Sequence, residues 1–371
     1  MLGSFRVADP MLKIMHIVGA RPNFPKVAPI MAELAKRPDR FHQALVHTGQ
    51  HYDYNMSQVF FEELEMPPPD EFLNVGSASH ATQTAAIMTA FEPVVLKYRP
   101  DWVMVVGDVN STLACSIVCS KLGVRVAHVE AGLRSGDRTM PEEINRLLTD
   151  QIAELLFTPS RDADENLVRE GVDRARIRFV GNVMIDTLAR LLPKALHRSV
   201  LKDLCLQPGE FVLVTMHRPS NVDDPAALAG ICQSMAEISK SAPVVFPVHP
   251  RTRNRIQQLN LELPNSSLRL IEPLGYLDFV ALMNAAALVV TDSGGVQEET
   301  TYLGVPCLTV RPNTERPITL TEGTNRLVSN RCDDLITHAR SALPSQGRSP
   351  RRPEFWDGRS ANRIVSVLLD L

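Results

Sequence analysis

The stretch WVMVVGDVNSTLACSIVCSKLGVRVAHVEAG (102–132) places two short, mainly apolar runs on either side of a longer helical segment. The runs WVMVV and VRVAHV are rich in valine and show no strict alternation, which is typical of strands buried on both faces of a parallel sheet. The segment between them ends at Gly123 and is long enough for a covering helix. The stretch therefore predicts a strand, a helix and a second, parallel strand.

The same alternation extends along most of the chain. One series begins at Lys13, and a second begins with FVLVTMH (211–217). The segment between them (184–210) is helical in pattern, contains Pro193 and closes at Pro208-Gly209, which suits a linker. The sequence thus predicts α/β domains over residues 12–190 and 205–350, followed by a C-terminal tail and helix over 351–371.

Composition limits the classes of function. The chain has 371 residues, of which 44% are hydrophobic and 22% charged, and its formal net charge is −3. This length suits two domains, and the charge gives no broad attraction to nucleic acid or to anionic membranes. The six cysteines include no CxxC pair, and no apolar run approaches the roughly 18 residues that span a bilayer. We therefore expect a cytoplasmic protein that binds neither nucleic acid nor membranes.

Polar residues follow five of the predicted strands. Ligands of open parallel sheets bind beyond the carboxyl ends of the strands, and those ends carry Asp108, Glu130, His217, His249 and Asp292. Asp108 alone would be explained more simply as the cap of the next helix. Carboxylates gathered in one site raise each other's proton affinity, so one can act as an acid while another acts as a base. Asp108, Glu130 and Glu142 are candidates for such a set.

Glu142 lies in HVEAGLRSGDRTMPEEINR (128–146) and has two interpretations. Thr139-x-x-Glu142 is typical of a capping box at a helix start. An apolar stripe on this helix would face the core, and Glu142 and Arg146 would point away from it as a surface ion pair; the stripe comprises Ile144, Leu147, Leu148, Ile152 and Leu155. The alternative is that both charged residues serve a site.

The second domain contains a candidate anion site. Ser293-Gly294-Gly295 follows a strand and opens a helix, where free backbone N–H groups suit a phosphate, although a tight turn would use the same residues. We place Glu298 and Glu299 in the first turn of this helix, where a carboxylate complements the helix dipole or accepts hydrogen bonds from a ribose. Arg21, Lys26, Arg316 and Arg326 are either solvated or suited to a diphosphate. His217 could be a general base, a phosphate donor or a structural histidine.

Other classes of site find no support. His47 and His51 have no evident third partner, so we predict no metal site. A Ser/His/Asp or Cys/His triad is not favoured either, because the chain has no GxSxG sequence or similarly placed nucleophile.

Eight motifs in order resemble the non-hydrolysing UDP-N-acetylglucosamine 2-epimerases, and they cover nearly the whole chain. They are GARPNFPK (19–26), VVGDVNST (105–112), HVEAGLRSGD (128–137), MPEEINR (140–146), MHRPSNVD (216–223), PVHPRTR (247–253), TDSGGVQEE (291–299) and TERPITLTEGTNR (314–326). The resemblance implies a glycosyltransferase-B-like fold, in which two Rossmann-like domains face each other across a cleft and the C-terminal helix returns to the N-terminal domain. It also implies a homodimer.

The implied reaction interconverts UDP-N-acetylglucosamine and UDP-N-acetylmannosamine without NAD or metal. UDP is eliminated to form 2-acetamidoglucal and is then added back after reprotonation at C2. By motif, the catalytic residues are Asp108, Glu130, Glu142 and His217. The residues that hold the UDP-sugar are Arg21, Lys26, Arg146, Ser293, Gly294, Gly295, Glu299 and Arg316. Which acid removes the C2 proton stays open. Bacterial relatives can bind a second UDP-N-acetylglucosamine as an activator, which we connect with Gln50, His51 and His249.

The chain departs from the family pattern at GARPNF, where GTRPE is common. The loop between Glu130 and Glu142 is also shorter than in enterobacterial members. Related enzymes that act on UDP-sugars with a C6 carboxylate or a second acetamido group share much of the pattern. The alternatives are therefore an epimerase for such a sugar, a UDP-sugar glycosyltransferase of the same fold, a hydrolysing 2-epimerase or a non-catalytic nucleotide-sugar sensor.

Overall fold

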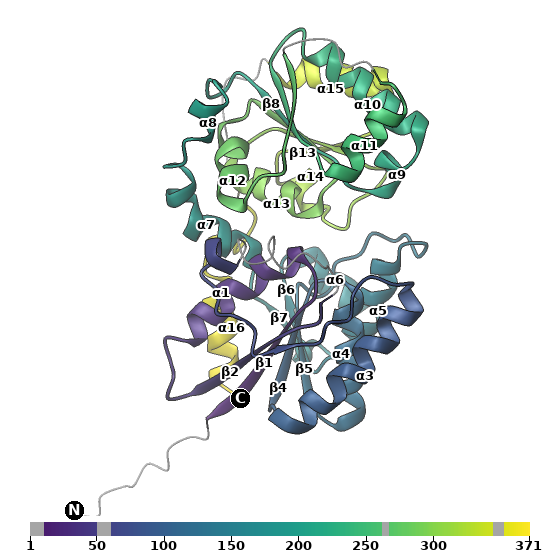
Figure 1. Cartoon of the computed structure of the whole chain (residues 1–371). Helices are drawn as coiled ribbons and strands as arrows, with labels where there is room; N and C mark the ends of the chain where they lie inside the picture. Colours follow the sequence, from purple (N-terminus) through teal and green to yellow (C-terminus); the bar gives the residue numbers. More distant parts are fainter. Residues whose placement is uncertain (1–10, 50–60, 262–266, 344–351) are drawn as a thin grey trace, which may run out of the picture. The chain divides into compact units, whose positions relative to one another are not determined.

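The computed structural model describes residues 11–49, 61–261, 267–343 and 352–371 and divides the chain into two compact units (Figure 1). Unit 1 comprises the described residues up to Thr187 together with Arg359–Leu371, and unit 2 is Leu188–Gly358. Helix α7 (Val183–Ala195) crosses the division and contains Pro193.

Unit 1 contains a seven-stranded parallel sheet in the order β3-β2-β1-β4-β5-β6-β7. Its strands are β1 (Leu12–Val18), β2 (Phe41–His47), β3 (Glu71–Phe72), β4 (Trp102–Val106), β5 (Arg125–Val129), β6 (Leu155–Thr158) and β7 (Ile177–Phe179). Its helices are η1 (Arg21–Asn23), α1 (Phe24–Leu34), α3 (His80–Tyr98), α4 (Asn110–Leu122), α5 (Pro141–Ile152), α6 (Arg161–Arg169), η2 (Arg174–Arg176) and α16 (Ser360–Leu369). Figure 1 shows α1 and α16 on one face of this sheet and α3, α4 and α5 on the other.

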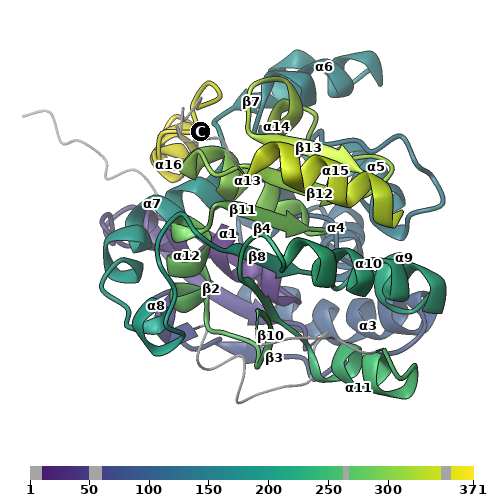
Figure 2. The ribbon, with the colours of Figure 1, turned by 90° about the horizontal axis from the view of Figure 1, so that it is seen from above.

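Unit 2 contains a six-stranded parallel sheet in the order β10-β9-β8-β11-β12-β13. Its strands are β8 (Val212–Thr215), β9 (Val244–Pro247), β10 (Leu268–Ile271), β11 (Leu288–Thr291), β12 (Cys307–Val310) and β13 (Asn325–Val328). Its helices are α8 (Val200–Asp203), α9 (Pro219–Val222), α10 (Pro225–Ile238), α11 (Pro250–Gln258), α12 (Tyr276–Ala285), α13 (Gly294–Leu303), α14 (Ile318–Thr321) and α15 (Cys332–Ala342). Helices α10 and α15 lie side by side in both views (Figure 2) and share an apolar core with the sheet.

Both strand orders are those of a Rossmann-like sheet, which confirms the predicted fold class. The order reverses between β1 and β4 in unit 1 and between β8 and β11 in unit 2. Ligands of such sheets bind at these reversal points, beyond the carboxyl ends of the strands. The residues that follow β1, β4, β8 and β11 are therefore the ones whose geometry matters most. Buried Cys115 and Cys119, both free thiols, belong to the core of unit 1, as their apolar context predicts.

The C-terminal helix α16 packs against α1 within unit 1. The buried carboxylate of Asp186 on α7 accepts hydrogen bonds from the backbone N–H groups of Ser360 (3.0 Å) and Ala361 (2.7 Å) at the start of α16. Asp186 thus satisfies N–H groups that a helix start leaves without partners and complements the positive end of the helix dipole.

Replacing Asp186 by alanine should lower the free energy of unfolding by about 1–2 kcal/mol, because two buried N–H groups lose their acceptor. Urea unfolding monitored by circular dichroism measures this change. Asp370→Ala is the matched control, because Asp370 is exposed near the end of the same helix and should have little effect. Equal stability of the two variants would contradict the capping role.

Candidate active site

The turn after β1 is fixed by Asn23. Its Oδ1 accepts hydrogen bonds from the N–H groups of Gly19 (3.0 Å) and Ala20 (2.9 Å), and its Nδ2 donates to the carbonyl of Val106 at the end of β4 (3.2 Å). Asn23 stands where the common GTRPE pattern has glutamate, so here a neutral amide ties the first turn to the neighbouring strand. Arg21 lies in the same turn and is half-buried.

Lys26, in the first turn of α1, forms a buried ion pair with Glu130. Glu130 directly follows β5 and has a φ of +70°, in the left-handed region that a residue with a side chain rarely adopts. Strained backbone of this kind often occurs at functional sites. Gly107 has a φ of +66°, and a Cβ there would lie 3.0 Å from Lys26 Nζ and 3.5 Å from Glu130 Oε2. A side chain at position 107 would therefore be strained and would crowd the ion pair.

Asp108 does not cap α4, whose N-cap residue is Val109. Its carboxylate instead forms an ion pair with the buried Arg146, and its carbonyl accepts a hydrogen bond from Asn145 Nδ2 at 2.8 Å. Arg146 also binds Glu143, through Nε at 3.0 Å. Since the guanidinium lies between two carboxylates, it fixes the position of Asp108 at the carboxyl end of β4.

The predicted orientation of helix α5 is wrong. Its buried side chains are polar and comprise Glu143, Asn145, Arg146, Thr149 and Asp150, whereas Leu148 of the expected core stripe is 47% exposed. The predicted capping box is also wrong, because Met140 is the N-cap residue and Thr139 binds Asp137 instead. Polar contacts with the site, rather than apolar packing, determine which face of this helix is buried.

The structure therefore brings Asp108, Glu130, Lys26 and Arg146 together around the ends of β4 and β5, but it leaves Glu142 exposed in the first turn of α5. Arg146 pairs with Glu143 rather than with Glu142. Sequence reasoning overlooked Glu143. Its carboxylate accepts hydrogen bonds from the N–H groups of Ser135 (3.0 Å) and Gly136 (2.9 Å). It thereby ties the loop after Glu130 to Arg146.

In unit 2, the buried carboxylate of Asp292 organises the end of β8. It accepts hydrogen bonds from the N–H groups of His217 (3.1 Å) and Arg218 (2.9 Å) and from Asn221 Nδ2 (3.1 Å), and it lies 2.8 Å from His217 Nδ1. Burial alone would raise the pKa of Asp292, but these contacts outweigh it and hold that pKa below the ordinary value. Asp292 therefore orients the His217 ring, which remains 60% exposed.

Ser293, Gly294 and Gly295 form the start of α13, with Ser293 as its N-cap. A Cβ on Gly294 would lie only 2.5 Å from Arg316 Nη1 and 2.9 Å from Glu315 Oε1, so the position admits only glycine without rearrangement. Arg316 is buried against Glu298 (Nε to Oε1, 2.8 Å) and Glu315, which also binds Arg311 (2.6 Å). The guanidinium beside the helix start is therefore shared between Glu298 and Glu315, and the helix start itself is the part that suits an anion.

Glu299 lies in the second turn of α13, not the first, and is buried. It accepts a hydrogen bond from Tyr276 Oη at 2.7 Å. Burial raises the pKa of Glu299 to about 7, with a smaller contribution from the charge of Glu298 and an opposing one from the Tyr276 hydroxyl. Arg326, by contrast, is exposed on β13 and does not follow a strand.

Ionisation of Glu299 should make stability depend on pH. Its pKa is raised from 4.5 to about 7 in the folded chain, so the folded state binds more protons than the unfolded state between these values. Unfolding free energy should therefore fall as pH rises through this window, by up to about 3 kcal/mol. Urea titrations at both ends of the window measure this loss, and Glu299→Gln should remove it. An unchanged pH dependence in Glu299→Gln, matching that of the exposed-site control Glu92→Gln, would contradict the assignment.

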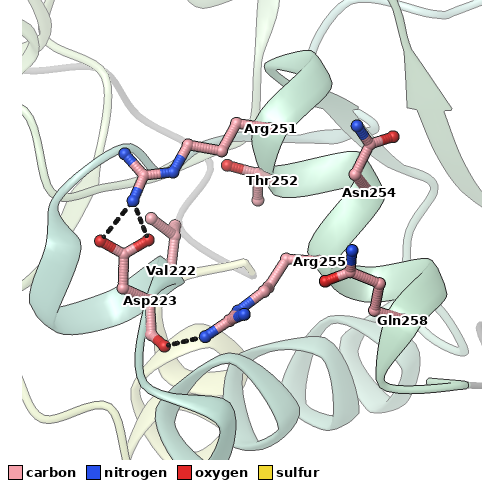
Figure 3. Close-up of a pocket in the computed structure, with 7 residues that line it drawn as sticks. All are labelled: Val222, Asp223, Arg251, Thr252, Asn254, Arg255 and Gln258. Atoms are coloured by element: carbon pink, nitrogen blue, oxygen red, sulfur yellow. Dashed lines mark hydrogen bonds and ion pairs between the residues drawn. The ribbon is translucent and has the colours of Figure 1, made fainter.

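The remaining predicted residues fall in different places. Gln50 and His51 lie outside the described residues. His249 is the N-cap of α11, and its Nδ1 accepts from the N–H of Arg251 at 3.3 Å. A pocket of about 660 Å³ lies beside α11, where Arg251 forms a two-bond pair with Asp223, but His249 does not line it (Figure 3). The predicted activator site stays a prediction.

Two kinds of feature are absent from residues 11–49, 61–261, 267–343 and 352–371. Within those ranges, no three or more His, Cys, Asp or Glu side chains are grouped so that they could hold a metal ion. No helix in the same ranges is long and apolar enough to cross a membrane.

Comparison with known proteins places the chain in a family. Residues 32–369 match the family described as UDP-N-acetylglucosamine 2-epimerase. The UDP-N-acetylglucosamine 2-epimerase of Methanocaldococcus jannaschii is 43% identical over 96% of this chain and 99% of its own. The UDP-2,3-diacetamido-2,3-dideoxy-D-glucuronate 2-epimerase of Pseudomonas aeruginosa is 42% identical over 97% of this chain and 100% of its own.

A solved structure extends the likeness to three dimensions. The M. jannaschii UDP-GlcNAc 2-epimerase in complex with UDP-GlcNAc and UDP superposes with a TM-score of 0.89, at 42% identity over 97% of this chain and 100% of that one. The fold is therefore glycosyltransferase-B-like, as the motifs predict.

Proposed function

Because the chain belongs to the UDP-N-acetylglucosamine 2-epimerase family, we propose that it interconverts UDP-N-acetylglucosamine and UDP-N-acetylmannosamine at C2. The observation that carries the proposal is the pair of carboxyl groups at the ends of β4 and β5. Glu130 is paired with Lys26, and Asp108 is paired with Arg146. Proton transfer at C2 needs both a base and an acid, and carboxyl groups can serve as either.

The reaction proceeds by elimination and readdition. A base takes the C2 proton, the electron pair forms the C1–C2 double bond of 2-acetamidoglucal, and the C1–O bond breaks so that UDP leaves with that oxygen. Protonation of C2 from the opposite face, followed by return of UDP to C1, gives the epimer. Asp108, Glu130 and Glu142 are the proposed acids and bases. A loop or domain movement that excludes water would protect the glycal.

UDP is the proposed ligand of the cluster in unit 2. Ser293 and the N–H groups of Gly294 and Gly295 at the start of α13, with Arg316 beside them, suit the diphosphate. The Ser293 N–H itself donates to Thr291 Oγ1 at 3.0 Å. His217, which Asp292 orients, can donate to the leaving phosphate. Glu299 is the proposed partner of the ribose hydroxyls, and Arg21 assists the diphosphate.

Incubation with UDP-N-acetylglucosamine alone in D₂O tests the proposal. We expect both UDP-sugars to carry deuterium at C2 at equilibrium, because the proton that returns comes from solvent. A chain that forms neither UDP-N-acetylmannosamine nor deuterated substrate would not be this epimerase. Release of free UDP with N-acetylmannosamine would instead identify a hydrolysing enzyme, and transfer of the sugar to an added acceptor would identify a glycosyltransferase.

The substrate itself needs a direct comparison. One relative acts on a diacetamido glucuronate and is almost as similar as one that is named for UDP-N-acetylglucosamine. We commit to UDP-N-acetylglucosamine, since the family match carries that name. Measuring kcat/KM for both UDP-sugars decides the point, and a higher value for the diacetamido glucuronate would overturn this part of the proposal.

A homodimer is also proposed, in the cytoplasm. Large apolar side chains are exposed on three neighbouring helices of unit 1, namely Leu96 on α3, Leu122 on α4 and Leu148 on α5. Apolar side chains gathered on one side of a protein often mark an interface. Light scattering should give a molar mass near twice the 41.1 kDa of one chain, and a monomeric mass at micromolar concentration would contradict the dimer.

A further inference from the structure

A second set of connected polar side chains lies next to Asp108 and Glu130 in unit 1, and the proposed reaction does not use it. His128 on β5 and Asp150 on α5 are both fully buried, and His128 Nδ1 lies 2.6 Å from Asp150 Oδ1. Asp150 also binds Arg134 (2.8 Å), which forms two hydrogen bonds with Glu170, the C-cap residue of α6 (2.8 and 2.7 Å).

Both ring nitrogens of His128 face hydrogen-bond acceptors. Nδ1 faces the Asp150 carboxylate, and Nε2 lies 2.8 Å from the carbonyl of Gly107. A carbonyl oxygen cannot donate, so Nε2 must carry a proton. The other oxygen of Asp150 lies 2.8 Å from the guanidinium of Arg134, an ion pair that keeps this carboxyl group ionised and able only to accept. An ionised Asp150 cannot donate either, so Nδ1 must also carry a proton.

Asp150 fixes the backbone around both acids. One of its oxygens binds His128, which in turn holds the Gly107 carbonyl of the peptide that joins Gly107 to Asp108. The other oxygen accepts from the N–H of Gly132 at 3.1 Å, two residues after Glu130. A single carboxylate therefore secures the turn that carries Asp108 and the strained turn that carries Glu130.

From these contacts we infer that both ring nitrogens of His128 carry a proton and that His128 and Asp150 are positioning residues for Asp108 and Glu130; the catalytic part of this inference rests on the proposed function. Neither residue touches the substrate. Their effect is to hold two acids from neighbouring strands in a fixed relation, with a buried positive charge behind them. A neutral imidazole would leave a buried lone pair facing an acceptor, which is destabilising.

The protonation state is tested without any substrate. In the full-length chain labelled with ¹⁵N-histidine, the His128 signals are identified by their absence from the spectrum of His128→Gln. We expect both ring nitrogens of His128 to show the chemical shift of protonated nitrogen at neutral pH. A shift typical of an unprotonated nitrogen at either position would overturn the imidazolium, whatever reaction the chain catalyses.

Positioning is tested with a matched pair of variants. In His128→Gln the side-chain amide nitrogen takes the place of Nε2 and can still donate to the Gly107 carbonyl. In His128→Asn the amide nitrogen takes the place of Nδ1, so it can donate to Asp150 but not to Gly107. We expect His128→Asn to lower kcat on the order of 10- to 100-fold with little change in KM. His128→Gln should lose only a few-fold. The control is His16→Gln, which alters another fully buried histidine in the same sheet, paired with Gln43, and should leave kcat unchanged.

Three outcomes remain to be distinguished. Equal kcat values for folded His128→Asn and His128→Gln, or a change in KM alone, would overturn the positioning role. If both variants fail to fold, Asp150→Asn replaces them, and in that variant we expect a lower kcat with little change in KM; an unchanged kcat would overturn the positioning role. If the wild-type chain shows no epimerase activity, the proposed function fails, while the nitrogen shifts still decide the charge of His128.

Discussion

Replacing Glu130 by glutamine should lower kcat on UDP-N-acetylglucosamine by about 10²- to 10⁴-fold while UDP still binds. The amide keeps the shape of the carboxylate but can neither take nor return a proton. Lys26 would then face a neutral partner in a buried site. UDP affinity should change little, because most of the proposed diphosphate residues belong to unit 2. Initial rates and calorimetric titration with UDP measure the two quantities separately.

The control for Glu130→Gln is Glu92→Gln, an exposed glutamate on α3 whose loss should leave kcat unchanged. Asp108→Asn and Glu142→Gln complete the comparison. We expect each of them to reduce turnover, with UDP binding kept. Wild-type turnover in all three site variants would show that the reaction takes place elsewhere, whereas wild-type turnover in Glu142→Gln alone would remove only that exposed residue from the proposed set.

The fold could be predicted from the sequence because the information is local. Strands buried on both faces must be apolar over their whole length, and the turns that follow them must change composition abruptly, as at Gly107-Asp108 and Ser293-Gly294. Once strand and helix alternate, the carboxyl ends of the strands meet at one edge of each sheet. The sequence therefore predicts that Asp108 and Glu130 are neighbours, although it does not show the contacts of either side chain.

Helix α5 shows where local patterns fail. Its apolar spacing predicts a buried stripe that contains Leu148, but its polar face is the buried one. The burial of that face is stabilised by partners on other elements, which a helical pattern does not include. Arg146 pairs with Asp108, and Asp150 pairs with His128. An amphipathic pattern identifies two faces of a helix. Only the rest of the fold decides which of them faces the protein.

The roles of residues that support the site could not be predicted for a related reason. Asn23, Glu143 and Asp292 act by accepting hydrogen bonds from backbone N–H groups, and those of Asp292 lie at a different strand end, far along the chain. Any Asp, Asn or Glu could do this, so the residue type carries little information. The sequence places Asp292 at a strand end, but its link to His217 depends on β8 and β11 being neighbours.

Arg146→Met should combine lost turnover with a large loss of stability, about 3–5 kcal/mol in the free energy of unfolding. The methionine fills much of the space but leaves Asp108 and the buried Glu143 without their shared cation. A surface arginine gives the matched control. Arg251 also makes two hydrogen bonds to one carboxylate, that of Asp223, but it is 73% exposed. Arg251→Met should therefore cost less than about 1 kcal/mol, since water screens its ion pair.

Urea unfolding of the two methionine variants measures this difference. Adding Asp108→Asn to Arg146→Met should restore part of the lost stability, because it removes one of the two carboxylates left without a partner. It should not restore turnover, because Asp108 is itself a proposed acid. If Arg146→Met were no less stable than Arg251→Met, the buried polar face of α5 could not owe its position to this guanidinium, and the proposed control of Asp108 by Arg146 would have to be abandoned.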